Sequence, residues 1–474
     1  MKMINIRKIF LILLTFFFLG CQNMQNDVYK KPNIIIIYTD DMGIGDASYT
    51  GGDIVIPTPN IDQMAKEGKV FTQYYTPAPV CSPSRVGVFT GTYHIRWNIN
   101  TFLSSVKWNK KTGQSDYLVT KAPNMAKVFK KAGYKTAHYG KWHMGGGRDV
   151  KAPTLDQYGF DDFVSTWESP NPDPLLTSSN WIWKPEDSIK RWERTKYFVD
   201  HTLEFLKKNP DQPCFINLWP DDVHTPWVPS EQSQENWKEK GFQLPPLKLV
   251  MEDYDKEIGR LLRSLKEMEI AENTLVIFTS DNGPAPSFER LRTNGLRGIK
   301  NSIYEGGVKM PFIVWWPGTI IGGQKDDKSI IASIDLLPTL ASITGADINA
   351  QLVDGEDFSS TLIGSTPFNR NKNLYLEYGR NPDFNFPKDF IDKSPHLAVR
   401  SDKWKLLTNT DGSQMELYDL ATDPNESDDI SNQNLEFAND LKKEIINWYN
   451  ETDRSETDDI RSLHLQNNVN YEEN

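Results

Sequence analysis

Short apolar runs alternate with helical patterns along most of the chain. The run at residues 33–39 is continuous and β-branched, which is typical of a strand buried on both faces of a sheet. Similar runs follow at residues 134–139, 213–219, 274–280 and 311–316. Helical patterns lie between the runs, at residues 61–66, 124–132, 195–207 and 249–268. This alternation predicts an α/β domain whose sheet is large, mixed but mostly parallel, and sandwiched by helices.

Polar segments with potentially catalytic or metal-binding side chains directly follow four of these runs. They occupy residues 40–41, 140–143, 221–224 and 281–283. Open α/β sheets bind ligands outside the carboxyl ends of their strands, so we expect the four segments to converge on one crevice. Asp40, Asp41, Asp281 and Asn282 offer three carboxylates and an amide oxygen, which are the ligands that Ca²⁺ or Mg²⁺ requires. Each segment alone also fits a turn, but together they predict a divalent-metal site.

Two of the seven histidines, His143 and His224, also follow predicted strand ends. A histidine near a tryptophan is often a packing residue, and Trp142 and Trp227 keep that interpretation open. Two histidines in this position favour acid–base or anion-binding work.

The N-terminus has the pattern of an export signal. A basic start and an apolar run over residues 9–19, short for a bilayer crossing, end at Gly20-Cys21. This resembles a lipoprotein signal (residues 1–20), with Cys21 lipidated and residues 21–31 as a tether. Phe18 stands where an aliphatic residue is usual, so plain secretion and an uncleaved anchor are the alternatives. We therefore expect a protein of the cell envelope, anchored by lipid in the periplasm or at the outer membrane surface.

Composition describes a large enzyme rather than a nucleic-acid-binding protein. The 474 residues are 38% hydrophobic and 12% aromatic, enough for one large domain and a smaller one. The net charge of −11 argues against nucleic acid as a partner, although a local cationic pocket can still bind an anion. The three cysteines do not predict a disulfide framework, and Cys214 fits a small buried residue in a strand.

The segment from Cys81 to Gly91 places a cysteine where a helix begins, followed by Pro83 in the first turn and by Arg85. The positive end of the helix dipole and Arg85 would make the thiol reactive or favour an anion there. A buried structural cysteine before an ordinary helix is the simpler alternative. Cys81, Pro83, Ser84, Arg85, Thr90 and Gly91 in register nonetheless match C-x-P-S-R-x-x-x-x-T-G, the signature of the type I, formylglycine-dependent sulfatases.

The resemblance to this family, part of the alkaline phosphatase superfamily, extends over roughly residues 32 to 430. Further matching segments are 224–226, 297–300, 304–307, 404–406, 416–420 and 423–424. The resemblance implies an alkaline-phosphatase-like catalytic domain (residues 32–368) and a C-terminal subdomain with a small antiparallel sheet and a polar tail (residues 369–474). It also implies that a maturation enzyme oxidises Cys81 to formylglycine (3-oxoalanine). That residue would ligate a metal, usually calcium, together with Asp40, Asp41, Asp281 and Asn282.

The resemblance further assigns roles to five polar residues. Arg85 and Lys141 would hold the formylglycine and neutralise charge. His143 would contact its hydroxyl and assist release of the sulfate. His224 and Lys300 would bind the sulfate and protonate the leaving oxygen. These residue types suit a sulfate monoester, whose dispersed negative charge needs fixed cations and donors around it.

The predicted activity is therefore hydrolysis of sulfate monoesters, with a sulfated carbohydrate from a polysaccharide as the expected substrate. Candidates for contacting the sugar are His94, Arg96, Trp97, Trp181, Trp183 and Arg380. Two alternatives remain open at this point. One is a phosphatase or phosphodiesterase of the same superfamily, and the other is a noncatalytic glycan-binding lipoprotein that uses some of its 14 tryptophans.

Overall fold

A computed structural model of the chain describes residues 31–52, 57–178, 181–239, 245–288, 290–379 and 387–454. Within these ranges one large sheet has eight strands in the order β10-β2-β9-β7-β1-β6-β4-β5. Their bounds, in that order, are Gln324–Asp326, Lys69–Phe71, Phe312–Trp315, Thr274–Ser280, Asn33–Thr39, Cys214–Trp219, Lys135–Gly140 and Asp162–Ser165. The sheet is mixed and mostly parallel, as predicted, because only β9 runs antiparallel to its neighbours β2 and β7.

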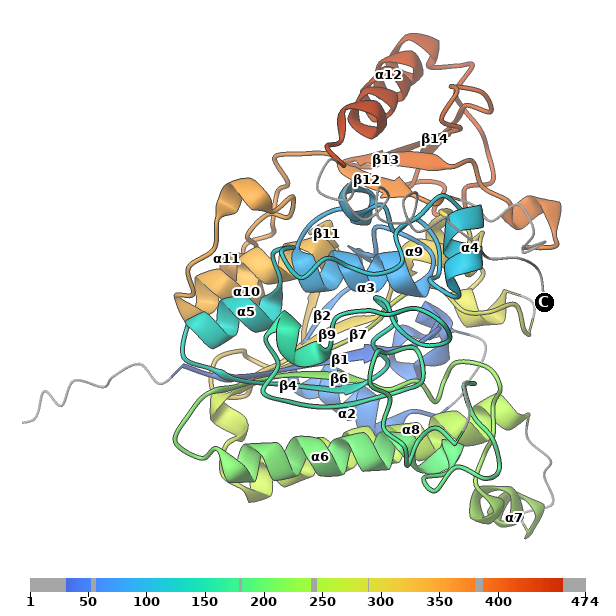
Figure 1. Cartoon of the computed structure of the whole chain (residues 1–474). Helices are drawn as coiled ribbons and strands as arrows, with labels where there is room; N and C mark the ends of the chain where they lie inside the picture. The colour runs from blue at the N-terminus through green and yellow to red at the C-terminus, as the bar shows by residue number, and fades with distance from the viewer. Residues whose placement is uncertain are drawn as a thin grey trace, which may run out of the picture.

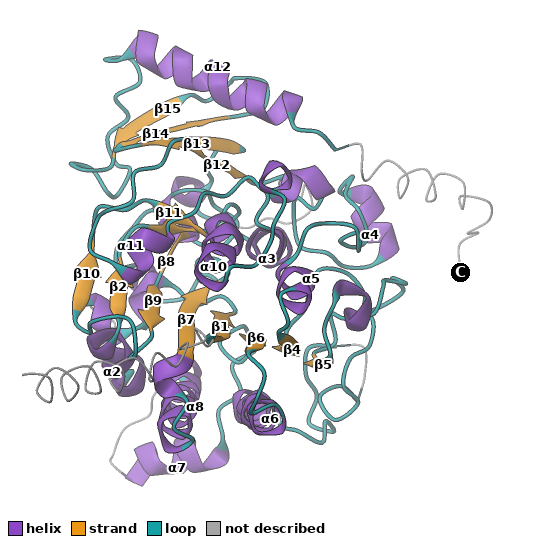
Figure 2. Cartoon of the chain, turned by 90° about the vertical axis from the view of Figure 1, so that its left-hand side faces the viewer, coloured by secondary structure: helices purple, strands orange, loops and turns teal. Residues whose placement is uncertain are grey.

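Helices cover both faces of this sheet (Figures 1 and 2). One face carries α2, α6 and α8, with α7 beyond them, at Pro59–Glu67, Arg194–Lys208, Pro246–Glu267 and Glu231–Glu239. The other face carries α3, α5, α10 and α11, at Cys81–Thr90, Met125–Lys131, Leu336–Thr344 and Ser359–Ile363. Short helices α4 and α9 span Val106–Lys111 and Glu305–Val308. The predicted alkaline-phosphatase-like sandwich is confirmed.

Strand β1 is central because its side chains enter both cores. Ile34 and Ile36 pack with Phe89 of α3 on one face. Ile35 and Ile37 pack with Phe198 of α6 on the other face. All four isoleucines are fully buried, so a continuous apolar run is what this position requires. The polar residues that directly follow the parallel strands lie at the carboxyl edge of the sheet.

The C-terminal part forms a second sheet, seen at the top of Figure 1. It is antiparallel in the order β12-β13-β14-β15, at Leu374–Glu377, Leu397–Ser401, Trp404–Thr408 and Glu416–Asp419. Helix α12 (Leu435–Glu451) packs on one face of this sheet. The other face shares a core with Tyr75, Val80 and Cys81, next to the small sheet β11-β3-β8 at Ile331–Ala332, Tyr74–Tyr75 and Lys309–Met310. The predicted antiparallel subdomain is present and supports the segment that holds Cys81.

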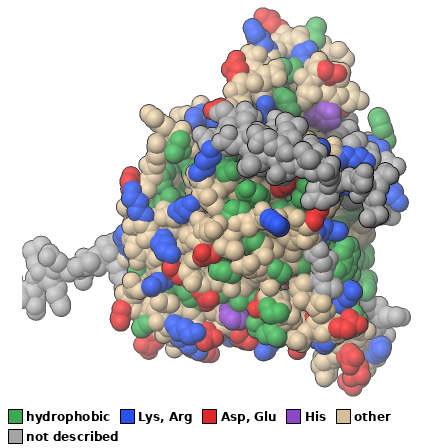
Figure 3. Space-filling model, in the orientation of Figure 1, with side chains coloured by type: hydrophobic (Ala, Val, Ile, Leu, Met, Phe, Trp, Pro, Cys, Tyr) green, Lys and Arg blue, Asp and Glu red, His purple; other side chains and the backbone are tan. Residues whose placement is uncertain are grey.

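The surface is mixed in charge. Figure 3 shows Lys and Arg side chains interspersed with Asp and Glu side chains, rather than gathered into one basic surface, over the coloured atoms of that face. Among the residues described, no helix combines the length and apolarity that a membrane crossing needs. The predicted signal, the lipidation site Cys21 and nearly all of the tether lie outside the described residues.

Acid should weaken the fold through His138, a buried residue of β4. Its ring lies between those of Trp142 and Trp219, at centroid distances of 5.4 and 5.1 Å. Burial, with a contribution from Arg85, lowers the pKa of His138 to about 3. The neutral ring therefore adds stability above the pKa of an unfolded histidine, about 6.5, and that stability is lost as the pH falls toward the folded value.

We expect the free energy of unfolding, measured with urea, to fall between about pH 6.5 and pH 4. His138 alone contributes a slope of up to about 1.4 kcal/mol per pH unit. His138→Phe should reduce the slope of the wild-type curve by about one proton per chain. A variant with the wild-type slope would show that His138 titrates normally in the folded protein.

Candidate active site

The four segments singled out by the sequence meet at one edge of the large sheet. Strands β7, β1, β6 and β4 are consecutive neighbours and all run parallel. Their carboxyl ends therefore lie side by side and deliver residues 281–283, 40–41, 221–224 and 141–143 to the same place. The predicted convergence is confirmed.

Carboxylates and cations alternate within this cluster. Lys141 Nζ lies 2.9 Å from Asp40 Oδ2, and an Arg85 Nη lies 2.7 Å from Asp281 Oδ2. Lys300 Nζ lies 2.7 Å from the Asp41 carboxylate. Three cations thus face three acids that are almost completely buried. Such a dense arrangement fixes the direction of the acids and favours the ionised forms of Asp40 and Asp41.

Helix α3 positions Cys81 and Arg85. Val80, in extended conformation, caps its start, and Gly91 at φ 68° ends it. Cys81 is therefore the first helical residue, and Arg85 follows one turn later on the same side. Ser84 Oγ donates a hydrogen bond of 2.5 Å to the carbonyl of Asp281, which joins the helix to the end of β7.

The unmodified thiol is less reactive than its position in the sequence indicates. Burial, only partly offset by Lys141, raises the pKa of Cys81 to about 12. Arg85 bonds to Asp281 and to the Lys141 carbonyl rather than to the sulfur. Desolvation therefore outweighs the helix terminus, which argues against the expected activation of the unmodified thiol.

The acids of the cluster differ in their titration. Burial raises the pKa of Asp40, but the surrounding cations, Lys141 first among them, together outweigh burial and hold the pKa well below its usual range. The pKa of Asp41 is lowered in the same way, with Lys300 as the main cation that opposes burial. Burial raises the pKa of Asp281 to about 7, against the effect of Arg85. Asp40 and Asp41 are consequently the stronger anionic donors of the site.

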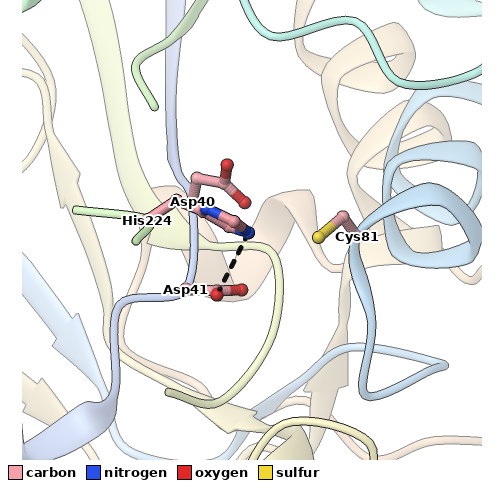
Figure 4. Close-up of side chains that lie close together, drawn as sticks. All are labelled: Asp40, Asp41, Cys81 and His224. Atoms are coloured by element: carbon pink, nitrogen blue, oxygen red, sulfur yellow. Dashed lines mark ion pairs between the residues drawn. The ribbon is translucent and has the colours of Figure 1, made fainter. Parts of the chain in front are cut away.

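An oxygen-rich group of side chains points into the space in front of Cys81. Potential ligand atoms of Asp40, Asp41, Cys81 and His224 all lie within 4.8 Å of one another (Figure 4). Asn282 Nδ2 donates a hydrogen bond of 2.7 Å to Asp41 Oδ1, and its own Oδ1 is buried with no hydrogen-bond partner among the described residues. Such an unused acceptor oxygen is what a hard cation binds.

His143 is held as a neutral base. Its Nε2 lies 3.0 Å from the Leu103 carbonyl, which only accepts, so Nε2 carries the proton and Nδ1 has a lone pair. Burial, reinforced by Lys141, lowers the pKa of His143 well below its usual value. Its backbone sits at φ 51° and donates a hydrogen bond to the Glu168 carbonyl. The strained backbone and both hydrogen bonds fix the ring at the site.

His224 and Lys300 form a coupled pair. Nδ1 of His224 bonds to the Thr225 carbonyl at 2.5 Å, so Nε2 has the lone pair and faces Lys300 Nζ at 3.3 Å. Burial, followed by Lys300, lowers the pKa of His224 to about 4. Burial lowers the pKa of Lys300, but the surrounding acidic groups, Asp41 first among them, together outweigh burial, raise the pKa and keep Lys300 protonated. The pair therefore carries its proton on the lysine.

The predicted sugar contacts lie in varied surroundings. Trp97 is buried in the core and bonds to Thr92, and Arg96 forms an ion pair with Asp354. His94 is buried, with Nε2 3.6 Å from a Glu377 oxygen. Trp181 is 47% exposed and lies close to Trp167, at a ring distance of 5.8 Å. Trp183 lies in the same segment, Arg380 lies outside the described residues, and sugar contact by any of the six stays a prediction.

The sequence did not single out two neighbours of the site. Glu168, whose carboxylate lies 3.6 Å from Lys141 Nζ, follows strand β5, whose four residues are too few for a clear pattern. Arg191 precedes α6 in a polar stretch and reaches the segment after β6. Only the three-dimensional fold brings these distant residues to the site.

The sheet, with acids, cations and an oxygen-rich cluster at its carboxyl edge, defines an alkaline-phosphatase-like hydrolase. A family model described as Sulfatase matches residues 32–346, and one described as N-sulphoglucosamine sulphohydrolase, C-terminal, matches residues 299–451. The chain belongs to the sulfatase family and is a sulfuric ester hydrolase.

Similar proteins come from bacteria and animals. The chain is 27% identical to an N-acetylgalactosamine-6-O-sulfatase of Bacteroides thetaiotaomicron, over 90% of this chain and 95% of the relative. It is 29% identical to arylsulfatase A of Homo sapiens, over 84% of this chain and 83% of the relative. A structure from work on glycosaminoglycan metabolism by Bacteroides thetaiotaomicron covers 87% of this chain, and the match spans 98% of that structure, with a TM-score of 0.72 and 25% identity. A complex of Ps i-CgsB with a neocarrahexaose is 24% identical in sequence. Its fold matches 93% of this chain and 98% of that structure, with a TM-score of 0.73.

Proposed function

We propose that the protein removes the 6-O-sulfate of an N-acetylgalactosamine unit, using a formylglycine made from Cys81 and a bound Ca²⁺. The observation that carries the proposal is the cluster of Asp40, Asp41, Lys141 and Lys300 around the N-terminal residue of α3. Several relatives carry the name N-acetylgalactosamine-6-sulfatase, which supports the choice of sugar and position.

The residues present fit a calcium ion. Carboxylates of Asp40, Asp41 and Asp281 and the free amide oxygen of Asn282 make the hard donor set that Ca²⁺ prefers over softer ligands. Arg85, Lys141 and Lys300 balance the charge of the three acids when no metal is bound. A calcium ion bound there supplies positive charge for the sulfate oxygens and lowers the pKa of a hydroxyl group at position 81.

Formylglycine suits position 81 because its hydrated aldehyde offers two hydroxyl groups on one carbon, one for attack and one for release. The chain's own part in attack is to aim residue 81 from the fixed start of α3. Arg85 and Lys141 fix the acids around it through the contacts at 2.7 and 2.9 Å. The site is thus organised before substrate binds, as electrostatic catalysis requires.

In this proposal Lys300 and His224 protonate the sugar oxygen as it leaves. The ammonium of Lys300 holds the proton, and Nε2 of His224 accepts a hydrogen bond from it. Passing the proton from this pair to the oxygen avoids expelling an alkoxide. His143, neutral and with Nδ1 free of a hydrogen bond in the described structure, is suited to accept a proton when the enzyme releases sulfate.

The remaining sequence predictions join this proposal. They are a dedicated maturation enzyme for Cys81, export to the cell envelope with Cys21 as a lipid attachment site, and the division into residues 32–368 and 369–474. The family assignment favours a sulfatase over the phosphatase and glycan-binding alternatives.

The test is sulfate release by protein produced together with a maturation enzyme. N-acetylgalactosamine 6-sulfate, its 4-sulfate isomer and the 6-phosphate are compared, with product ions measured by ion chromatography. We expect kcat/KM for the 6-sulfate to exceed that for the 4-sulfate by about tenfold or more. Preference for the 4-sulfate would overturn the assigned position. Protein that carries formylglycine and releases sulfate from neither sulfated sugar would overturn the proposed function.

A further inference from the structure

An arginine outside the catalytic cluster braces the segment that carries His224. Arg191 is 1% exposed and lies before α6. One Nη of Arg191 donates to the carbonyl of Asp221 and, at 2.9 Å, to the carbonyl of His224. Its other Nη donates to the Asp221 carboxylate. A single guanidinium therefore ties both ends of the turn from residue 221 to residue 224.

The turn itself is short, and the other backbone hydrogen bonds that hold it among the described residues are local, including one of 2.8 Å from Trp227 Nε1 to the Val223 carbonyl. His224 N donates a hydrogen bond of 3.1 Å to the Asp221 carbonyl, the same oxygen that Arg191 contacts. The ring bonds through Nδ1 to the adjacent Thr225 carbonyl. Nε2 then lies 3.3 Å from Lys300 Nζ and 3.6 Å from Asp41 Oδ2. A shift of the turn would change these distances directly.

A second arginine at the same carboxylate provides a matched comparison. Arg194 also donates to Asp221 Oδ2, at 2.8 Å, and is equally buried. Its other contacts are hydrogen bonds to the carbonyls of Leu176 and Ile182 and an ion pair with Asp187 at 3.6 Å, all away from the turn. Arg191 and Arg194 thus share burial and ion pairing, and only Arg191 contacts the His224 backbone.

We infer that Arg191 is a positioning residue, which holds His224 in register with Lys300 so that the pair delivers its proton to the leaving sugar oxygen. This inference rests on the role proposed for the pair. Lysine cannot replace the fork of hydrogen bonds, because its single ammonium is a point donor on a flexible chain. Losing the brace should matter most where the leaving group needs a proton.

The test compares a sulfated sugar, whose alcohol leaves poorly, with 4-methylumbelliferyl sulfate, whose phenol leaves as an anion. For Arg191→Lys we expect kcat on the sugar to fall about 30-fold or more, KM to change less than threefold, and kcat on the aryl sulfate to fall less than about threefold. Arg194→Lys should lose less than about threefold on both substrates.

A double-mutant cycle separates positioning from general destabilisation. Adding Arg191→Lys to His224→Ala should cost less than about twofold, since the brace then has no ring to position. The inference would be overturned if the double variant showed the full further loss of kcat, if kcat fell equally on both substrates, or if Arg194→Lys showed the same pattern.

If Arg191→Lys does not fold, Asp221→Asn, which removes the charge that anchors Arg191, provides a second test. Its loss of kcat should depend on the leaving group in the same way, and equal losses on both substrates would overturn the inference. Wild-type protein inactive on both sulfates would instead count against the proposed function.

Discussion

Replacing Cys81 by serine is expected to stop the enzyme after one sulfate transfer. A serine hydroxyl can attack sulfur: it gives its proton to a base of the site, its oxygen forms a bond to sulfur, and the bond from sulfur to the sugar oxygen breaks. The sugar oxygen takes its proton from the pair of Lys300 and His224. Serine has no second hydroxyl whose proton loss would expel the sulfate, so the ester persists. Intact mass spectrometry after incubation with substrate should show the added mass of one SO₃ group per chain.

Cys81→Ala is the control for this prediction. It lacks any nucleophile, so neither turnover nor added mass is expected, while the thermal unfolding midpoint should remain close to that of the serine variant because both side chains are small. Robust multiple turnover by either variant would contradict the assignment of residue 81. Lack of any serine adduct, with substrate still bound, would count against a covalent route.

Removing the metal is expected to reduce activity to a similarly large extent. Wild-type enzyme stripped with a calcium chelator should lose about 10³-fold or more in kcat/KM and regain it when Ca²⁺ is returned. Calcium at about 100 times its Kd should stabilise the fold by about 2.7 kcal/mol. Asp40→Asn should lose both responses, because it removes a buried carboxylate whose ionised form Lys141 favours.

Asp255 offers a matched control for this experiment. It is a buried carboxylate on α8 that accepts hydrogen bonds from the backbone of Asn60 and Ile61 in α2. Asp255→Asn should lower the unfolding midpoint yet leave calcium affinity, measured by titration calorimetry, unchanged. Calcium binding by Asp40→Asn as tight as by the wild type would contradict the metal site.

Local patterns predicted most of the elements that build the site. Strands β1 and β7 have the bounds that their apolar runs indicated, because a strand buried on both faces needs such a run. Helix α5 (Met125–Lys131) lies within the predicted range 124–132, and the side chain of Asn124 caps its start. Residues that directly follow a buried strand inherit their position from it. Asp40, Asp41, Asp281 and Asn282 could therefore be placed before the fold was known.

Other features depend on contacts that no local pattern encodes. The reversed direction of β9 leaves no mark on its run of apolar residues. Trp97 follows the signature helix, and sequence alone does not separate a sugar contact from the buried packing position that it occupies. Arg191 reaches the His224 segment across 33 residues of chain. Such long-range contacts depend on how helices and loops pack at the edge of the sheet.

The most direct measurement is the mass of the tryptic peptide from Val70 to Arg85, taken from protein made in its native host or together with a matching maturation enzyme. We expect residue 81 to appear as formylglycine, with an aldehyde that reacts with hydrazide reagents. A peptide that carries only the unmodified thiol, despite competent maturation, would contradict the assignment of formylglycine as the nucleophile, since a thiol whose pKa is raised to about 12 is a poor nucleophile at this site.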